Sequence, residues 1–515
     1  MRKNFLLLPA VLLACAFATP SHDVLAQGSQ ASDAVQRAAS AEMSIALQEY
    51  DEARDILSKT NDPEHPAVAL ARGRLAIDEG DCDLAASIFQ RADLAKHEAG
   101  AALGDIARGC ARVVAANVVD RDELNHIEIR YQDEHDRALT PILVETTVKA
   151  RESLTRDLGV SWPKVTRIFV VRDLLSLSAM TGLPYDSAKT TGTVAVAKWG
   201  RVTLTSPRAP RHGYGWRDTL AHELTHLSIS RKSGDRAPLW LQEGLAKREE
   251  TRWRAPLVLD DTPPVEAVVA RGMELKLDLP LDKLGPSIAM LPTADAAMVA
   301  FAEVTSFVRY VAESRPEGTL GKLLDALRTA PSVDEALKIA TSADLKTWDT
   351  EWRAAVAKRP KVPLSPLYGL GGATPAVSMT EVRERSRLGE LLLGRDHPAE
   401  ALLELGKVAD KASVGDPALA YLHARALESH GKVDDARSRL SDLKNLIGAY
   451  GPFFAMRGRL GERDSETRRR DFAMAISHDP FLPEAACETL APPAPDETPL
   501  CRSAREFSPP DLGKD

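Results

Sequence analysis

The chain has 515 residues, which is enough for about three domains of typical size. Its apolar fraction of 44% is that of an ordinary globular protein. The formal net charge is −8, and acidic and basic residues are interleaved with no basic stripe, which argues against a nucleic-acid-binding surface.

The N-terminus has the pattern of an export signal. Arg2 and Lys3 precede the apolar segment Phe5–Ala18, which Pro9 interrupts. This segment is too short for an ordinary membrane span and has the length of the apolar core of a secretory signal peptide. The sequence therefore predicts an exported protein.

Two cleavage sites are compatible with this signal. The small-residue pattern "VLA" before Gln27 would make residues 1–26 the signal peptide of a periplasmic protein. The pattern "LLAC", ending at Cys15, resembles the bacterial lipobox, in which residues 1–14 are removed and Cys15 is lipidated. The second alternative would anchor the protein to the outer membrane, and the sequence leaves both open.

Four cysteines lie outside the signal and fall into two sequence-local pairs. We predict the disulfides Cys82–Cys110 and Cys487–Cys501, because an even number of cysteines in an exported protein suits an oxidising compartment. The alternative is four unpaired thiols.

Residues 27–120 are predicted to be helical and are rich in alanine. The related stretches Glu49–Leu57 and Asp81–Phe89 are offset by 32 residues, and each opens a helix that follows another helix. A period near 34 with small residues at helix crossings resembles tetratricopeptide repeats. We therefore expect an N-terminal repeat region.

Beyond Leu124 the pattern changes to a mixture of strands and helices. Alternating or β-branched composition predicts the following strands: His126–Tyr131, Lys164–Val171, and a hairpin over Gly192–Ser206. Trp199 and Gly200 are at the hairpin turn. A helix is expected from about Ala138 to the stop at Gly159.

Two further helices follow the hairpin, one carrying "HELTH" and one over Ala237–Glu250, with Pro238 in its first turn. Residues 255–357 are again helical, with clear helices over 296–314 and 344–359. A Pro/Gly-rich linker, Arg359–Ala376, separates this region from a second set of helical pairs over 377–491. Ala401 and Ala436 occupy corresponding positions there. The tail, 492–515, is Pro-rich and expected to be loosely ordered.

The motif "HELTH" places His222 and His226 four residues apart. On a helix these positions share one face, so both imidazoles can bind one Zn²⁺ at about 2.0–2.1 Å. Glu223 would lie beside the metal and reach a zinc-bound water as a general base. The alternative is two ordinary histidines on a helix surface.

A catalytic zinc needs three protein ligands and one open position. A metzincin would have Gly and His where this chain has Ile229 and Lys232, so that class is excluded. A gluzincin takes Glu from a following helix, and Glu243 lies 17 residues after His226. Gly244 would allow close packing against the helix of the motif.

Other downstream acids are weaker candidates for the third ligand. Asp235 is expected in the connecting turn, and Glu249 and Glu250 fall in a charged stretch that suggests a solvated helix end. Glu243 sits amid apolar residues and would be costly to bury unless paired or metal-bound. A salt bridge from Glu243 to Arg217 or Arg248 is the alternative.

The stretches "TLAHELTH" and "PLWLQEGLA" together resemble the gluzincin-type "peptidase MA-like" domains of bacterial exported proteins. The resemblance covers about residues 124–357, including "TGTVAVAKWGRVTLTSP", "SFVRYVAE" and the helix of Trp352. It implies an α+β zincin-like metallopeptidase domain, residues 121–358, with an all-α tetratricopeptide-like region on each side. It also implies a single Zn²⁺ with His222, His226 and Glu243 as ligands and Glu223 as base. Lys247 departs from thermolysin-like enzymes, which have Asp at this position, so the residues that orient the ligands must differ.

A peptide substrate would bind by adding a strand to an exposed sheet edge. "TVAVA" or "VTLTS" could supply that edge, with small Ala195 and Ala197 leaving room for substrate side chains. Tyr214 and Tyr310 are candidate oxyanion donors. In each case ordinary packing is the alternative.

Two functions from different classes fit the sequence. The first is an exported zinc endopeptidase whose helical repeats bind protein substrates or partners. The second is a repeat scaffold with a non-catalytic zincin-like domain. Retention of Glu223 within the motif favours the first.

Overall fold

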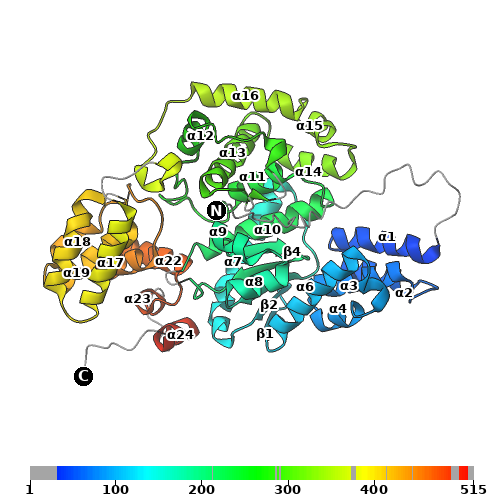
Figure 1. Ribbon diagram of the computed structural model, residues 1–515, viewed down its shortest axis with the longest axis horizontal. Helices are drawn as coiled ribbons and strands as arrows, with labels where there is room; N and C mark the ends of the chain where they lie inside the picture. The colour runs from blue at the N-terminus through cyan, green and yellow to red at the C-terminus, as the bar shows by residue number, and fades with distance from the viewer. Residues whose placement is uncertain are drawn as a thin grey trace, which may run out of the picture.

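The computed structural model describes residues 32–210, 213–284, 287–288, 291–372, 378–412, 415–443, 445–488 and 498–507. The predicted signal segment, with Cys15, lies outside these residues, as does part of the predicted linker. In Figure 1, N-terminal helices in blue lie at one side of a central sheet, and C-terminal helices in yellow to red lie at the other. No helix among the described residues is long and apolar enough to cross a membrane.

The central sheet has five strands in the order β1-β2-β3-β5-β4. Their bounds are β1 Val118–Asp122, β2 Ile127–Tyr131, β3 Thr166–Val171, β4 Ala195–Lys198 and β5 Arg201–Thr205. The two inner pairs, β2–β3 and β3–β5, are parallel, and both outer pairs are antiparallel. Strands β2 and β3 and the hairpin formed by β4 and β5 lie where the sequence predicted strands. The first strand was not predicted, because "VVDRD" is a half-exposed edge without an apolar run.

The hairpin turn follows from two residues with positive φ. Trp199 has φ 56° and Gly200 has φ 62°, which is the left-handed pair of a two-residue turn whose twist matches the flanking strands. Within the part of the chain that the structure describes, the turn makes β4 the outermost strand, paired only with β5. Of the two stretches proposed as a substrate-binding edge, only "TVAVA" is on the edge. The proposal for "VTLTS" was wrong, because β5 is paired on both sides.

Helices cover both faces of the sheet because its inner strands are apolar on both faces. Ile168 and Val170 of β3 face the core formed with α7 (Thr140–Leu158) and α10 (Trp216–Ser233). Phe169 and Val171 face the opposite side, toward α6 (Glu98–Val114) and α8 (Leu174–Thr181). The end of α7 at Gly159, φ 61°, was predicted correctly. The sequence did not predict α8 or α9 (Tyr185–Thr191).

The N-terminal region is a set of short helices that pack in succession along the chain: α1 Asp33–Ala46, α2 Tyr50–Ser58, α3 Pro66–Glu79, α4 Cys82–Ile88, α5 Ala92–Ala95 and α6. The predicted related stretches correspond to α2 and α4. These helical pairs have the organisation that repeats require, and their assignment as tetratricopeptide repeats stays a prediction.

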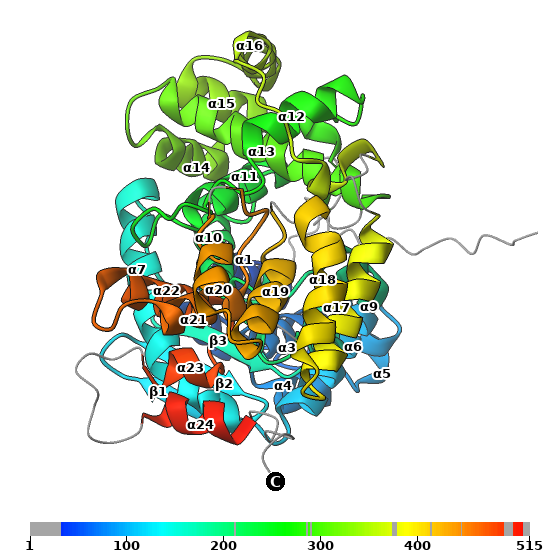
Figure 2. The ribbon, with the colours of Figure 1, turned by 90° about the vertical axis from the view of Figure 1, so that its left-hand side faces the viewer.

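A second helical layer lies above the sheet, as Figure 2 shows. Its helices are α11 Leu239–Glu249, α12 Val265–Glu274, α13 Ala294–Glu313, α14 Thr319–Thr329, α15 Val333–Thr341 and α16 Leu345–Lys358. Trp240, Phe307 and Trp352 stack edge to face in its core, with ring centres 5.2 and 5.8 Å apart. A Cβ at Gly244 would lie 2.6 Å from the carbonyl oxygen of Val304, so the glycine permits close packing against α13. The sequence prediction had placed this contact on α10 instead.

The C-terminal region consists, in its described part, of helices joined by loops: α17 Met379–Leu393, α18 Pro398–Ala412, α19 Pro417–Ser429, α20 Val433–Arg439, α21 Gly451–Leu460, α22 Glu466–His478, α23 Pro483–Ala486 and α24 Pro499–Phe507. Ala401 and Ala436 are both fully buried. Short 3-10 helices connect other elements: Glu134–Leu139, Leu281–Lys283, Pro366–Tyr368 and Leu370–Gly372.

The expectation of a loosely ordered tail is wrong for residues 498–507, which include α24. Ala504 of this helix is fully buried in the central core, and Cys501 is bonded to Cys487. The second predicted bridge, Cys82–Cys110, is also formed and is buried against the sheet. The structure thus has both disulfides that were predicted from the sequence.

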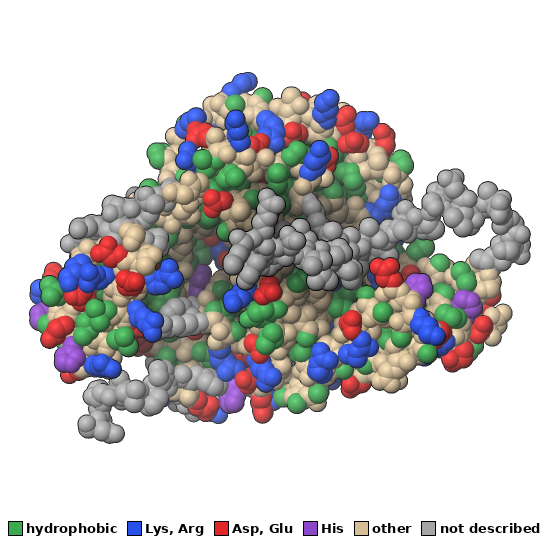
Figure 3. Space-filling model, viewed as in Figure 1, with side chains coloured by type: hydrophobic (Ala, Val, Ile, Leu, Met, Phe, Trp, Pro, Cys, Tyr) green, Lys and Arg blue, Asp and Glu red, His purple; other side chains and the backbone are tan. Residues whose placement is uncertain are grey.

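On the face shown in Figure 3, basic and acidic side chains are interspersed. This arrangement agrees with the interleaved charges of the sequence. It gives this face no single-sign field that would attract a polyanion.

Glu303 of α13 provides a test of the packing in the second layer. Its side chain is fully buried, its Oε2 accepts a hydrogen bond from the Leu279 amide at 3.2 Å, and its Oε1 has no hydrogen-bond partner among the described residues. Burial raises the pKa of this carboxyl from 4.5 to about 8. The folded state therefore keeps a proton that the unfolded chain loses above pH 4.5.

We predict that Glu303 lowers the free energy of unfolding as the pH rises from 5 to 8, by at most about 1.4 kcal/mol per pH unit. Glu303→Gln should remove this part of the pH dependence and be the more stable protein at pH 8. Denaturant unfolding of both proteins at pH 5 and pH 8 measures the difference. Identical pH dependence in both would contradict the prediction.

Candidate metal centre

Helix α10 holds the two histidines of the HELTH motif rigidly. It begins after Gly215 and ends at Gly234, whose φ of 63° stops the helix. Leu220, Ala221 and Leu224 on its inner side are buried in the central core. The histidines and Glu223 therefore project from the polar edge of a helix that packing fixes in place.

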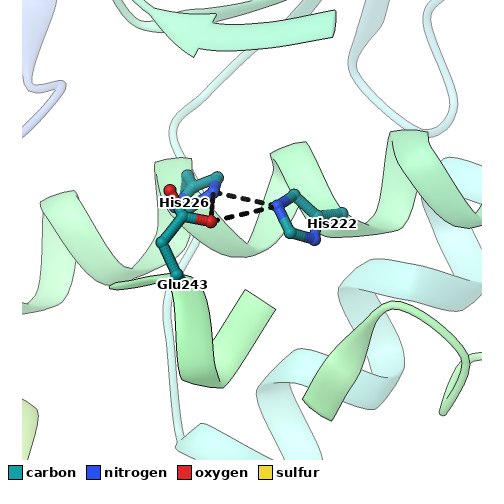
Figure 4. Close-up of side chains that lie close together, drawn as sticks. All are labelled: His222, His226 and Glu243. Carbon is teal, nitrogen blue, oxygen red and sulfur yellow. Dashed lines mark hydrogen bonds and ion pairs between the residues drawn. The ribbon is translucent and has the colours of Figure 1, made fainter. Parts of the chain in front are cut away.

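Glu243 of α11 meets the two histidines, as Figure 4 shows. The Nε2 atoms of His222 and His226 are 3.2 Å apart, and Glu243 Oε2 lies 3.6 and 3.7 Å from them. Potential ligand atoms of all three residues lie within 4.8 Å of one another. The three predicted ligands are therefore brought together at one point.

These distances fit a single metal ion. Two ligands bound about 2.0–2.1 Å from a tetrahedral zinc lie about 3.3 Å from each other. Two imidazole nitrogens and one carboxylate oxygen also form a donor set typical of zinc sites that keep the fourth position open. The residues present therefore match what the predicted ion requires.

The other ring nitrogen of each histidine has its own partner. His222 Nδ1 lies 3.0 Å from Glu250 Oε2, and His226 Nδ1 lies 3.2 Å from Gln242 Oε1. Both partners are acceptors, so each Nδ1 donates its hydrogen to its partner, and Nε2 is the atom of each ring that is available to a metal ion. Lys247 Nζ lies 3.1 Å from both carboxylate oxygens of Glu250.

The expectation that Glu249 and Glu250 form a solvated helix end was wrong. Glu249 is only 2% exposed and pairs with Arg248 and Arg252. Glu250 instead orients a histidine, because it lies seven residues, or two turns, after Glu243 and so shares its helix face. That spacing was the signal in the sequence that could have identified it.

Neither Asp235 nor the two arginines considered as partners of Glu243 takes part in the cluster. Asp235 lies in a left-handed turn, φ 61°, outside the cluster. Arg217 pairs with Glu145 and Arg248 with Glu249, so neither forms the salt bridge to Glu243 that had been considered. The prediction that Asp235 lies in the connecting turn is confirmed. The alternative of a salt bridge from Glu243 to Arg217 or Arg248 is wrong.

The electrostatics of the cluster favour a cation. Burial alone would lower the pKa of His222, but the carboxylates of Glu243 and Glu250 outweigh it and raise the pKa to about 10. Burial alone would raise the pKa of Glu250, but Lys247 and His222 lower it to about 2. The pKa of Glu243 is also lowered, despite its burial, by the two histidines. A metal ion would take the place of the proton that these carboxylates stabilise.

The cluster opens into a cavity of about 710 Å³. Edge strand β4 forms one wall, α12 and α13 form another, and α10 and α11 present the histidines and glutamates. Ala195 and Ala197 line the cavity as the prediction requires, and their role in substrate binding stays a prediction. Glu223 also lines it and is 7% exposed.

The two tyrosines proposed as oxyanion donors lie elsewhere. The Tyr214 hydroxyl donates to the Thr205 carbonyl at 2.5 Å, and Tyr310 packs edge to face on Trp348 at 6.0 Å. Neither residue lines the cavity, so the structure contradicts both proposals. Both sequence contexts were uninformative because the direction of a tyrosine side chain is set by partners on other elements, here Thr205 of β5 and Trp348 of α16.

Both flanking regions contact α10. The Trp216 indole donates to the Ile476 carbonyl at 2.9 Å, and the Tyr214 amide donates to the His478 carbonyl at 2.9 Å. From the other side, Gln48 Nε2 donates to the Leu227 carbonyl at 3.0 Å. The helix that carries the histidines is thus held by residues near both ends of the chain.

Comparison with known families identifies the central part of the chain. Residues 153–358 match the model of the Peptidase MA superfamily. The match supports a peptidase MA-like domain in this segment. The match contains α10 and α11, and therefore every residue of the candidate metal centre, while β1 and β2 precede it. No curated protein matches the chain.

The first prediction for the peptidase MA-like domain concerns the third ligand. Glu243→Ala should lose most of its zinc, because two imidazoles alone hold the ion weakly. Asp235→Ala, in the exposed turn outside the cluster, is the control and should keep about one zinc per chain. Metal analysis after zinc loading and dialysis measures both. Full zinc retention by Glu243→Ala would disprove its role as a ligand.

The second concerns the orientation of His222. Glu250→Gln should weaken metal binding by about 10- to 100-fold, because Nδ1 loses its charged acceptor. Glu249→Gln changes the neighbouring buried carboxylate, which touches neither histidine, and should bind metal like the parent. Competition with a chromophoric chelator gives both affinities. Equal affinities in the two variants would show that Glu250 has no such role.

Proposed function

We propose that the protein is an exported zinc-dependent endopeptidase of the gluzincin type. The observation that carries the proposal is the convergence of His222, His226 and Glu243 on one point in the wall of a cavity beside β4, the outermost strand of the described sheet. The match of residues 153–358 to the Peptidase MA superfamily supports it.

A zinc ion held by this group would polarise a substrate carbonyl and make water reactive at neutral pH. Glu223 is the base in this proposal. It follows His222 directly on α10, is largely buried and faces the cavity, so its carboxylate can accept a proton from the attacking water. The water oxygen bonds to the carbonyl carbon, the C–N bond breaks, and Glu223 passes the proton to the leaving nitrogen.

Strand β4 would bind the peptide backbone. Its outer edge is unpaired within the described sheet and lies along the same cavity as the metal centre. An extended substrate could pair with it through main-chain hydrogen bonds, which bind without regard to sequence. The small side chains of Ala195 and Ala197 leave space beside this backbone.

The flanking helical pairs would, as tetratricopeptide-like repeats, bind protein substrates or partners. Their contacts with α10 also make them part of the framework of the site. Export is supported by the predicted signal in residues 1–26 and by two disulfides, which suit an oxidising compartment. Cleavage before Gln27 would give a periplasmic protein, and cleavage before Cys15 would give a protein anchored through a lipid on Cys15.

The non-catalytic scaffold is the competing function. A scaffold would not require a carboxylate facing an open cavity next to the metal ligands, and Glu223 occupies that place. The position of Glu223 therefore favours the enzyme.

The proposal predicts that Glu223→Gln keeps its zinc and loses peptidase turnover by several orders of magnitude, because the ligands remain and the base is gone. Turnover of an unfolded casein substrate, together with zinc content, measures both properties. A chelator should abolish the parent's activity and added zinc should restore it. Equal turnover by Glu223→Gln and the parent would exclude this mechanism.

A further inference from the structure

Helix α13 presents one continuous face to the cavity, opposite strand β4. The lining residues follow the period of a helix: Met298, Phe301, Ala302, Thr305 and Arg309. Chemically this face has two parts. Its first turns are apolar, and it ends at Arg309, which lies 3.4 Å from Asp261. One stretch of the cavity wall is therefore apolar, although the metal centre beside it is highly charged.

The apolar stretch lies close to the metal centre. The Lys247 ammonium is 5.8 Å from the centre of the Phe301 ring, and the same ammonium binds Glu250, the partner of His222. Close packing of α11 on α13 at Gly244 sets this spacing. Phe301 therefore lies beside the charged residues that surround His222, in the wall of the cavity into which the metal centre opens.

Helix α12 completes the apolar stretch. A Cβ at Gly272 would lie 2.5 Å from a methyl carbon of Val299, so the glycine brings α12 close against α13. Val268 is fully buried at the cavity wall, and Val265 is partly buried beside it. Ala302, on the same face of α13, also lines the cavity and has the smallest side chain of this apolar wall.

We propose that this stretch, named the α12/α13 subsite, binds a large apolar side chain of the substrate next to the cleaved bond. It consists of Val265, Val268, Met298, Phe301 and Ala302. Moving an aliphatic or aromatic side chain from water onto this wall is favourable, whereas a charged side chain would lose its hydration there. The flexible thioether of Met298 can adapt to side chains of different shape. This inference rests on the proposed peptidase function and adds the residue class that the site selects.

The test uses the full zinc-loaded chain and a mixture of peptides from a digested proteome, with cleavage sites read by mass spectrometry. We expect Leu, Phe or Met to be enriched at one fixed position beside the cleaved bond. Two quenched fluorescent peptides that differ only there, with Leu or Asp, should then differ in kcat/KM by about 10- to 100-fold.

Ala302→Phe fills the subsite and should cut the rate with the Leu peptide at least about tenfold, shifting the enriched residue to Ala or Gly. Ala354→Phe adds the same ring on an exposed position of α16 and should keep the parent's preference. Zinc content and melting temperature show whether both variants fold. If Ala302→Phe does not, Phe301→Ala tests the same subsite by enlarging it, and should shift the preference toward larger residues.

The outcomes separate this inference from the proposed function. Cleavage without enrichment beside the bond, or a filled subsite with the parent's preference, overturns the subsite and leaves the peptidase standing. Binding of the two peptides to zinc-loaded Glu223→Gln needs no turnover. At least about tenfold tighter binding of the Leu peptide supports the subsite even if the parent cleaves nothing, which would overturn the peptidase alone. Equal binding of the two peptides overturns the subsite.

Discussion

The metal centre depends on holding α11 against α10 so that Glu243 reaches the Nε2 atoms of both histidines. The histidines are fixed relative to each other by one helix, but the carboxylate comes from a second helix, and a shift of about one ångström would remove it from the ligand set. Gly244 allows α11 to lie directly on α13, and the edge-to-face stack of Trp240, Phe307 and Trp352 fixes that layer. The position of Glu243, the proposed third ligand, therefore follows from the packing of large aromatic side chains in the layer above the sheet.

The candidate site also depends on the balance of positive and negative charges around its residues. Glu243 and Glu250 are both near His222, and Lys247 is the cation of the same helix that contacts Glu250. Burying these groups without partners would be unfavourable, and together they satisfy one another. Lys247 stands where thermolysin-like enzymes have an aspartate, and Glu250, the residue that directly follows α11, is here the carboxylate that contacts His222 Nδ1. The departure in sequence is thus compensated on the same helix face.

The flanking regions belong to the framework of the site as well as to its surroundings. The carbonyls of Ile476 and His478 accept hydrogen bonds from the start of α10, and Gln48 donates to a carbonyl just after His226. The segment that matches the Peptidase MA superfamily thus makes close contacts with both ends of the chain. If the helical pairs bind substrates or partners, as proposed, they do so while contacting the helix that carries His222 and His226.

The sequence by itself determined the features that depend on local spacing. The four-residue interval of His222 and His226 places them on one helix face, and the alternating stretch around Trp199 gives a hairpin. The apolar surroundings of Glu243 identified it among four acids, and sequence proximity was enough to pair the cysteines. Tertiary structure decided what depends on the direction of a side chain and on distant partners. Tyr214 and Tyr310 point into the core because Thr205 and Trp348 lie there, Glu250 turns inward because α11 is buried on the side of α10, and α24 is ordered because it packs on the core. Local periodicity fixes which residues share a face, but only the packing of one element on another fixes what that face contacts.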